Sequence, residues 1–355
     1  MSAGQQFASD NNAGICPEAL AALVSVNSAG HAPGYGEDRW TAAAIERVRE
    51  TFETRCEVFF VFNGTAANAL ALAALCRPYH AVLAHRLSHI ESDEASAPAF
   101  FSGGAKLIPL DGAMGKLSPL DIEAQVADAR SVHHSKPRAV SLTQATEVGT
   151  VYSPSELRAI SDAARRNGLH VHMDGARFAN AVASLGLAPA DLSWRTGVDV
   201  LSLGGTKNGL AVGEAVIFFH AGLAEEFAWR VKQSGQLASK LRFITAPWSA
   251  LLESGAWLAH ARHANRMARR LADAVAGLAG VKLLFPVEAN GVFLDLSLGL
   301  QAALRGAGWR FYTFLGETGC RFMCAWDTAP ETVDRLAADL TAAIAAPASA
   351  RGARR

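Results

Sequence analysis

The stretch 169–213 contains two short apolar runs, and each run ends in a turn that carries one functional side chain. Residues 169–173 are followed by Asp174, and residues 198–203 are followed by a Gly-Gly-Thr turn and Lys207. Short apolar runs that end in small or polar residues are typical of buried strands in a parallel sheet. Because ligands bind outside the carboxyl ends of such strands, we expect Asp174 and Lys207 to face one crevice.

A carboxylate and an amine at one crevice suit pyridoxal 5'-phosphate. The amine of Lys207 would form a Schiff base with the cofactor's aldehyde, and Asp174 would pair with the ring nitrogen and keep it protonated. Of the seven lysines only Lys207 follows a buried-looking run, whereas Lys106 opens one. Without Asp174, a solvated loop lysine would be the simpler interpretation. The turn is not a phosphate-binding Walker A loop, because the required glycine and Ser/Thr spacing is missing.

Composition limits the classes of function. The 355 residues are 50% hydrophobic, enough to bury a large core, and the length predicts two lobes. The 33 basic and 33 acidic residues balance, which argues against a nucleic-acid or membrane-surface partner. The chain has no apolar run of about 18 residues and no signal-peptide pattern at its start, so we expect a cytoplasmic protein. The five scattered cysteines predict reduced, packed thiols.

The order of elements predicts an α/β fold with a large, doubly wound, mostly parallel sheet. Predicted strands alternate with helical patterns, and the segments are strands 58–62, 81–84, 138–142 and 215–219 and helices 41–54, 66–75 and 154–167.

Four regions are expected along the chain. Residues 1–14 form a polar arm whose composition is typical of disorder, and residues 347–355 form a disordered tail. A large cofactor-binding domain covers 15–246. A smaller C-terminal α+β domain covers 247–346, and it is expected to hold one long helix over 248–278, strands over 281–285 and 292–296, and a closing helix over 330–345.

Two loops at predicted strand ends carry candidate cofactor contacts. Gly64, Thr65 and Ala66 join a strand to a helix, where free backbone amides can bind a phosphate. The alternative is an ordinary turn in which Thr65 caps the helix. His85 and His89 follow another predicted strand, where an imidazole can stack on a planar ring or carry a proton.

Other polar groups have structural explanations that compete with functional ones. The acidic residues of 91–94 are interpreted as a solvated helix face. His170 and His172 alternate with Asp174, but the sequence shows no third cluster of ligands at matching spacing, so no metal is expected. Arg321 lies in an apolar strand pattern, where its guanidinium forms either a salt bridge or a clamp for a substrate carboxylate.

Six motifs, in one order along nearly the whole chain, resemble the low-specificity L-threonine aldolases of the fold-type-I pyridoxal-phosphate enzymes, within the threonine aldolase/β-eliminating lyase family. The motifs are Phe7-Ala8-Ser9-Asp10, Tyr35-Gly36-Glu37-Asp38, Phe62-Asn63-Gly64-Thr65-Ala66-Ala67-Asn68, His172-Met173-Asp174-Gly175-Ala176-Arg177, Gly204-Gly205-Thr206-Lys207-Asn208-Gly209 and Arg321-Phe322-Met323.

The resemblance implies a role for each matching residue. Lys207 would carry the cofactor, and Asp174 would pair with its ring nitrogen. The other cofactor contacts implied are Gly64, Thr65 and Ala66 at the phosphate, His89 on the ring, Thr206, and Arg177 near the ring's phenolic oxygen. The substrate contacts implied are Ser9 and Arg321 at the carboxylate, together with Tyr35, Glu147 and Arg177.

The family forms homotetramers built as dimers of dimers. Lys232 and Lys240 of this chain fall where a neighbouring subunit's basic residues would reach the phosphate. The implied reaction is retro-aldol cleavage of L-threonine, L-allo-threonine and related substrates such as phenylserine to glycine and an aldehyde. A β-eliminating lyase or a transaminase on the same fold is the alternative.

One departure from the family concerns proton transfer. Many threonine aldolases carry a histidine near the substrate hydroxyl after the strand that ends near Leu142, and this chain has Glu147 there. The candidate bases are therefore His85, His89 or a water held by one of them. A dinucleotide-binding oxidoreductase is disfavoured because no G-x-G-x-x-G follows an early strand. A binding protein without activity would not need to retain Lys207 and Asp174.

Overall fold

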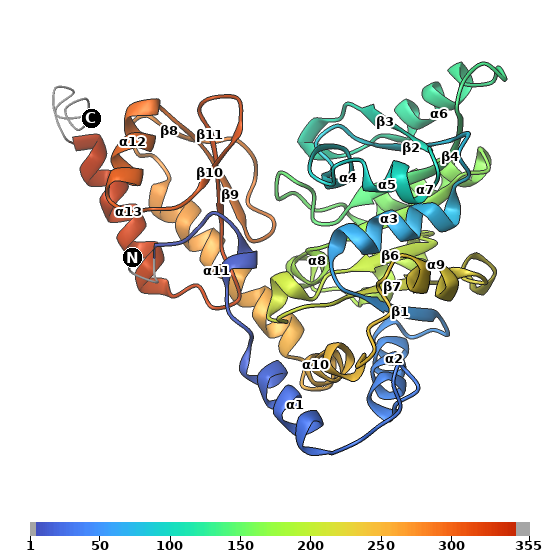
Figure 1. Cartoon of the computed structure of the whole chain (residues 1–355). Coiled ribbons are helices and arrows are strands. Elements are labelled where there is room, and N and C mark those ends of the chain that lie inside the picture. The colour runs from blue at the N-terminus through green and yellow to red at the C-terminus, as the bar shows by residue number, and fades with distance from the viewer. Residues whose placement is uncertain (1–4, 346–355) are drawn as a thin grey trace.

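The computed structural model describes residues 5–345, which form a large α/β part and a smaller C-terminal part (Figure 1). The large part contains a seven-stranded sheet with the order β1-β7-β6-β5-β4-β2-β3. The strands are β1 (Glu57–Val61), β2 (His80–His85), β3 (Lys106–Leu110), β4 (Lys136–Thr143), β5 (His170–Gly175), β6 (Val200–Leu203) and β7 (Glu214–Phe218).

Only β7 runs against its neighbours in this sheet, and the pairs from β6 to β3 are all parallel. The predicted fold class, a doubly wound and mostly parallel sheet, is confirmed. The helices of this part are α1 (Pro17–Ser28), α2 (Arg39–Phe52), α3 (Gly64–Leu75), α4 (His89–Ser92), α5 (Ala97–Phe101), α6 (Pro119–Asp128), α7 (Pro154–Arg166), α8 (Phe178–Leu185), α9 (Phe227–Gln233) and α10 (Arg242–Glu253). Short 3-10 turns are η1 (Asp10–Asn12), η2 (Ala113–Gly115), η3 (Pro189–Leu192), η4 (Trp194–Thr196), η5 (Thr206–Asn208) and η6 (Ala221–Leu223).

Both faces of the large sheet are buried. Leu83 and Val140 belong to one apolar cluster with helix residues such as Trp248, whereas Val82 and Ala139, their chain neighbours, belong to another cluster with residues of α3. Successive side chains of a strand point to opposite faces, so this division places a helical layer on each side. The sheet is therefore the middle layer of three, and its strand ends are the edge at which a ligand can be bound.

The smaller part is an antiparallel sheet covered by helices. Its strand order is β10-β11-β9-β8, and its elements are α11 (Ala256–Val275), which leads into it, β8 (Val281–Leu283), β9 (Gly291–Leu296), α12 (Leu298–Gly306), β10 (Tyr312–Leu315), β11 (Gly319–Met323) and α13 (Pro330–Ala345). α13 has the bounds that the sequence predicted. The long helix predicted over 248–278 is wrong, because it is divided into α10 and α11 at Gly255, whose φ of +71° is left-handed.

The structure also differs from two further expectations, a break in the chain at Pro247 and disorder in the N-terminal arm. Pro247 lies inside α10 instead of breaking the chain, and Trp248 is fully buried in the core of the large part. The core of the large domain therefore extends beyond the boundary predicted at 247. The disorder expected of the arm is wrong for residues 5–14, since Phe7 is fully buried and its amide donates to the carbonyl of Arg310. Residues 1–4 and the predicted tail at 347–355 lie outside the described residues.

Two further expectations can be compared with the described residues. The cysteines are all buried and none forms a disulfide, as predicted. No helix within residues 5–345 combines the length and the apolar character that crossing a membrane requires.

Candidate active site

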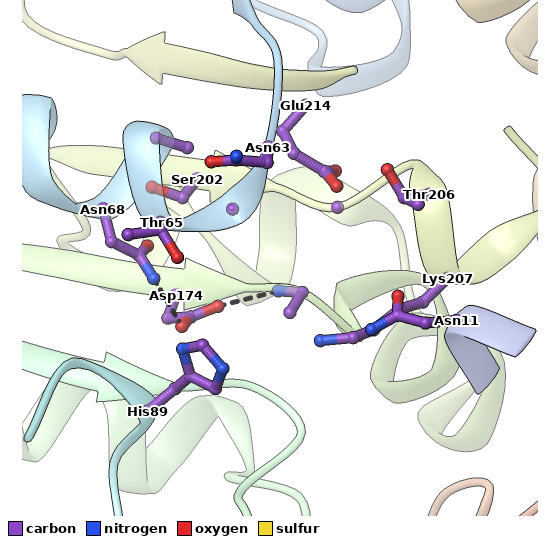
Figure 2. Close-up of a pocket in the computed structure, with 14 residues that line it drawn as sticks. Asn11, Asn63, Thr65, Asn68, His89, Asp174, Ser202, Thr206, Lys207 and Glu214 are labelled. Atoms are coloured by element: carbon purple, nitrogen blue, oxygen red, sulfur yellow. Dashed lines mark hydrogen bonds between the residues drawn. The ribbon is translucent and has the colours of Figure 1, made fainter. Parts of the chain in front are cut away.

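Asp174 and Lys207 line one cavity at the carboxyl edge of the large sheet (Figure 2). β5 and β6 are parallel neighbours, with Asp174 opposite Ser202 in the register, so their following turns open on the same side. The cavity has a volume of about 240 Å³ and is lined by Asn11, Asn63, Gly64, Thr65, Ala67, Asn68, His89, Asp174, Ala176, Ser202, Gly204, Thr206, Lys207 and Glu214.

Two hydrogen bonds hold the buried carboxylate of Asp174. One oxygen accepts from the amide of Ala176 at 2.9 Å, and the other accepts from the side-chain nitrogen of Asn68 at 2.8 Å. These bonds fix the direction of the carboxylate at the end of β5. A group at the cavity's centre therefore meets a negative charge whose position does not depend on that group.

The turn that carries Lys207 has room only for glycine. A Cβ atom on Gly204 would lie 2.5 Å from the carbonyl oxygen of Ala176, and one on Gly205 would lie 2.5 Å from the ring of Trp248. The backbone can therefore pass close to β5 and bring Lys207 to the cavity. Within residues 5–345 the amine of Lys207 has no hydrogen bond or ion pair, so it is free to react.

The start of α3 forms an open anion site. The side chain of Asn63 accepts from the amide of Ala66 at 2.9 Å, whereas the amides of Gly64 and Thr65 have no acceptor in the described part of the chain. A Cβ on Gly64 would meet nothing within 4 Å, which leaves space above these amides. Asn63 is thus the helix cap, rather than Thr65. Ala66, predicted as a third phosphate contact, does not belong to this anion site, because its amide is already bonded and it does not line the cavity.

His89 faces the same cavity and is bound through Nδ1 to Glu94 at 2.8 Å. Glu94 is buried and also accepts from Asn68 at 2.9 Å. The hydrogen bond that Nδ1 of His89 donates to Glu94 raises the pKa of His89, against the lowering effect of burial. Burial raises the pKa of Glu94. The prediction of a solvated helix face is therefore wrong for Glu94, although Glu91 and Asp93 are exposed.

A second cavity of about 220 Å³ adjoins the first and shares Asp174, His89 and Lys207 with it. Its other walls bring together the N-terminal arm and the C-terminal sheet, and they include Ser9, Asp93, Glu147, Arg177, Tyr312 and Arg321. The sequence predicted Ser9, Glu147, Arg177 and Arg321 as substrate contacts. They lie far apart in the chain but line one space.

Arg177 is held in place by the N-terminal arm. Its guanidinium donates to both oxygens of Asp10 at 2.7 and 2.8 Å, and Asn290 donates to one of the same oxygens at 3.0 Å. Burial alone would raise the pKa of Asp10, but the charge and hydrogen bonds of Arg177 outweigh it and lower that pKa to about 2. Asp10 is therefore a carboxylate that orients Arg177, a role for which the sequence gave no signal beyond the motif.

Arg321 and Glu147 carry charges into the second cavity with few partners. The guanidinium of Arg321 lies over the rings of Tyr312 and Phe314, and its buried Nε has no acceptor within residues 5–345. Burial and the nearby positive charge of Arg177 lower the pKa of Arg321. Burial raises the pKa of Glu147. A salt bridge from Arg321 to Asp327 or Glu317, the structural alternative, is not formed.

Comparison with known proteins identifies the family. Residues 6–298 match the model of the beta-eliminating lyase family. The chain is 60% identical to the low specificity L-threonine aldolase of Pseudomonas aeruginosa, over 95% of this chain and 97% of the relative. It is 57% identical to the one from a Pseudomonas species, over 96% and 99%.

The chain belongs to the low-specificity L-threonine aldolases of the beta-eliminating lyase family. The solved structure of Leishmania major threonine aldolase agrees, with a TM-score of 0.90, 30% identity, and coverage of 96% of this chain and 99% of that one. Mouse CSAD, at a TM-score of 0.77 and 16% identity, shares the fold alone. The sequence's prediction of a pyridoxal-phosphate-dependent carbon–carbon lyase is confirmed.

The residues of the first cavity fit pyridoxal phosphate. The unpaired amine of Lys207 suits the aldehyde, the two open amides of Gly64 and Thr65 suit the phosphate, and Asp174 suits the ring nitrogen. Asn68, another residue of the cavity wall, has a side-chain oxygen that is buried without a donor within residues 5–345. The family and the chemistry of the cavity therefore agree on the cofactor.

Five predicted site residues are not brought into either cavity. His85 is buried, and its two ring nitrogens are bonded to the carbonyl of Gly112 and the amide of Leu87. Tyr35 and Lys240 are exposed, and the amine of Lys232 lies 4.6 Å from the centre of the Tyr35 ring. Ala66 was described above. Glu94, Asn68 and Asp10 were missed as site residues, and only their places in the motifs or beside a histidine could have suggested them.

Proposed function

We propose that the chain cleaves L-threonine, L-allo-threonine and related β-hydroxy-α-amino acids such as phenylserine to glycine and an aldehyde. The observation that carries this proposal is the pairing of two cavities. One holds Lys207 and Asp174, and the adjoining one holds Arg321 without a carboxylate partner. An amino acid that reaches the cofactor through the second cavity would place its carboxylate at the guanidinium.

The cofactor would be held by residues of the first cavity. Lys207 would bind it covalently, Gly64 and Thr65 would donate to its phosphate beside Thr206, and His89 would lie against its ring. Asp174 would keep the ring nitrogen protonated. When bound, the cofactor accepts the electron pair of the Cα–Cβ bond as that bond breaks.

Arg321 and Ser9 would bind the substrate's carboxylate. A guanidinium binds a carboxylate with two parallel hydrogen bonds, which fixes the direction of the substrate as well as its position. Arg177, which Asp10 already orients, would lie beside the reacting centre. The benefit is orientation, because a substrate held in a fixed direction would present the bond to be cleaved to the cofactor.

His89 is the better candidate for moving the hydroxyl proton, either directly or through a water. Its Nδ1 is bound to Glu94, so Nε2 is left to accept the proton as the Cα–Cβ bond breaks. The aldehyde leaves, and a proton returned to Cα completes glycine. His85 is a weaker candidate because both of its ring nitrogens are bonded elsewhere. Glu147, with its raised pKa, would face the substrate side chain.

We also propose that the active protein is a homotetramer. Lys207 is the sole lysine or arginine lining the first cavity among the described residues, and a doubly charged phosphate calls for more positive charge. Lys232 and Lys240 lie outside their own chain's cavities and would supply that charge to a neighbouring subunit's cofactor. A cytoplasmic location stays a prediction.

Product analysis tests the reaction. Incubation with threonine or phenylserine should yield glycine and the matching aldehyde in equal amounts. Reactions with serine, threonine or alanine as the substrate, in which 2-oxo acids are measured, test the two alternative activities. A 2-oxo acid with ammonia would indicate a β-eliminating lyase, and amino-group transfer to an added 2-oxo acid would indicate a transaminase. Either result without aldehyde release would refute the proposal.

A further inference from the structure

Three potential metal ligands meet behind the turn that carries Lys207. A ligand atom of each of Cys16, Glu18 and His260 lies within 4.8 Å of the other two, and no other such group of three exists among residues 5–345. Cys16 and Glu18 stand at the start of α1, and His260 comes from α11. We propose that these side chains form a binding site for a divalent transition-metal ion of the zinc class.

The histidine is oriented for binding a metal. Nδ1 of His260 lies 3.4 Å from the carbonyl oxygen of Asn208, and Nε2 lies 3.8 Å from Oε2 of Glu18. A metal-binding histidine commonly donates its second N–H to a carbonyl, which leaves the other nitrogen free for the metal. Neighbouring ligand atoms on tetrahedral zinc are about 3.3 to 3.6 Å apart, so a small movement would close the site.

The ligand set selects for a soft cation. Thiolate and imidazole with one carboxylate suit zinc or cobalt, whereas magnesium and calcium prefer oxygen ligands alone. Oε2 of Glu18 is buried and makes no well-formed hydrogen bond within the described residues, where its polar neighbours are the Cys16 thiol and Nε2 of His260 at 3.8 Å, and a cation between the three would bind all of them. The Glu18 side chain as a whole is 37% exposed, which gives an ion a route from solvent.

The site is packed against the Lys207 turn. A Cβ on Gly209 would lie 2.9 Å from Cβ of Cys16 and 3.3 Å from Nδ1 of His260, and the amide of Cys16 donates to the carbonyl of Gly209 at 2.8 Å. A bound ion would thus join α1, α11 and this turn. The expected result is a protein that is more stable with the ion than without it.

The test uses the cofactor-loaded protein after treatment with a chelator. Equilibrium dialysis against zinc should give one bound ion per chain, and Cys16→Ser should weaken the affinity at least about tenfold. Cys56→Ser alters a buried cysteine away from His260 and should bind like wild type. Cobalt, used as a spectroscopic substitute, should give tetrahedral absorption bands at long wavelength that Cys16→Ser removes.

Two further variants protect the test against misfolding. Glu18→Gln and His260→Gln should each weaken binding, and circular dichroism would show that they are folded. Zinc should raise the melting temperature of wild type and Cys56→Ser but not of these variants. The proposal is overturned if wild type binds no zinc, or if Cys16→Ser, Glu18→Gln and His260→Gln all bind it as wild type does.

Discussion

Asn68 donates to the carboxylate of Asp174 across 2.8 Å, and the same nitrogen donates to Glu94 across 2.9 Å. Glu94 in turn holds Nδ1 of His89 at 2.8 Å. The side-chain amide of Asn68 therefore links Asp174, which is proposed to pair with the cofactor's ring nitrogen, through Glu94 to His89, which is proposed to lie against the ring. The four side chains form one network in a buried setting, so a change in one alters the electrostatics of the others.

Asp174→Ala should nearly abolish turnover, with kcat reduced by at least about 10²-fold, because the ring nitrogen loses the group that keeps it protonated. Asn68→Ala keeps the carboxylate of Asp174, so its kcat should fall less than that of Asp174→Ala. The measurement is kcat for threonine cleavage in folded protein whose cofactor content has been checked. A kcat near that of wild type in loaded Asp174→Ala would show that this pairing is wrong.

The covalent attachment proposed for Lys207 can be located directly. Borohydride reduction should remove the visible absorption of the purified protein and fix the cofactor to the peptide that contains Lys207. Mass spectrometry of the digested protein identifies that peptide. An adduct on Lys106, or no adduct on a protein that contains the cofactor, contradicts the assignment.

Glu94→Gln should shift the pH dependence of catalysis. Replacing the charged carboxylate with a neutral amide weakens the hydrogen bond that His89 makes and removes the negative charge beside it, so the pKa of His89 falls and the limb of the kcat/KM profile due to His89 moves to lower pH. The raised pKa of His89 stabilises the fold below about pH 6.5, and this contribution is lost as the pH rises through the folded pKa. The raised pKa of Glu94 likewise makes the folded protein less stable as the pH rises.

The melting-temperature difference between wild type and Glu94→Gln should therefore narrow as the pH rises above about 6.5. Glu91→Gln, an exposed change on the same short helix, is the matched control and should leave both profiles unaltered. If the pH profile of kcat/KM in Glu94→Gln matches that of wild type, Glu94 does not influence the reaction through His89.

Asp10→Asn should destabilise the fold by about 2 kcal/mol at neutral pH, since the pKa of Asp10 falls from 3.8 to about 2 on folding. A depressed carboxyl pKa contributes stability above its unfolded value, and this stability is lost as the pH falls through the folded value. The difference from wild type should thus stay constant from about pH 8 to about pH 5 and shrink only below about pH 4.

The unfolding midpoint in denaturant measures this effect. Asp334→Asn is the control, because Asp334 pairs with Arg270 by a similar bidentate contact at 2.7 Å on the exposed surface and should contribute little. Equal losses from Asp10→Asn and Asp334→Asn would show that burial of the Asp10 pair has no special effect on stability.

The sequence predicted the positions that depend on local pattern. Asp174 and Lys207 follow apolar runs, and a parallel sheet places such strand ends together, so their meeting could be expected from the chain alone. α13 agreed to the residue because a proline begins it and its apolar spacing continues to its end.

The rest depended on contacts between distant segments. Glu94 resembles a solvated acid in sequence, and only the folding of α3 against its loop brings Asn68 and His89 to it. The arm's polar composition conceals Phe7, which is buried by the C-terminal part. Pro247 suggested a break, but tertiary burial of Trp248 keeps α10 in the large core. Long-range pairing of this kind leaves no periodic signal.

Arg321→Ala should raise KM for threonine about ten- to a hundredfold and leave cofactor binding intact, because a bidentate charge-assisted pair contributes about 1.5 to 3 kcal/mol. The buried Nε of Arg321 has no acceptor within residues 5–345, and two aromatic rings hold the guanidinium. A substrate carboxylate is the partner that this environment lacks. Arg321→Lys keeps the charge without the fork, so its KM should lie between the two.

Steady-state kinetics and a thermal melt separate a substrate clamp from a structural role. Removing an arginine that has no ion pair should scarcely alter the melting temperature. The KM of Arg321→Ala should therefore rise without a loss of stability. Free guanidinium ion, added to Arg321→Ala, should restore part of the affinity because the vacated space admits it. A lower melting temperature with an unchanged KM would mean that Arg321 supports the fold and that the carboxylate binds elsewhere.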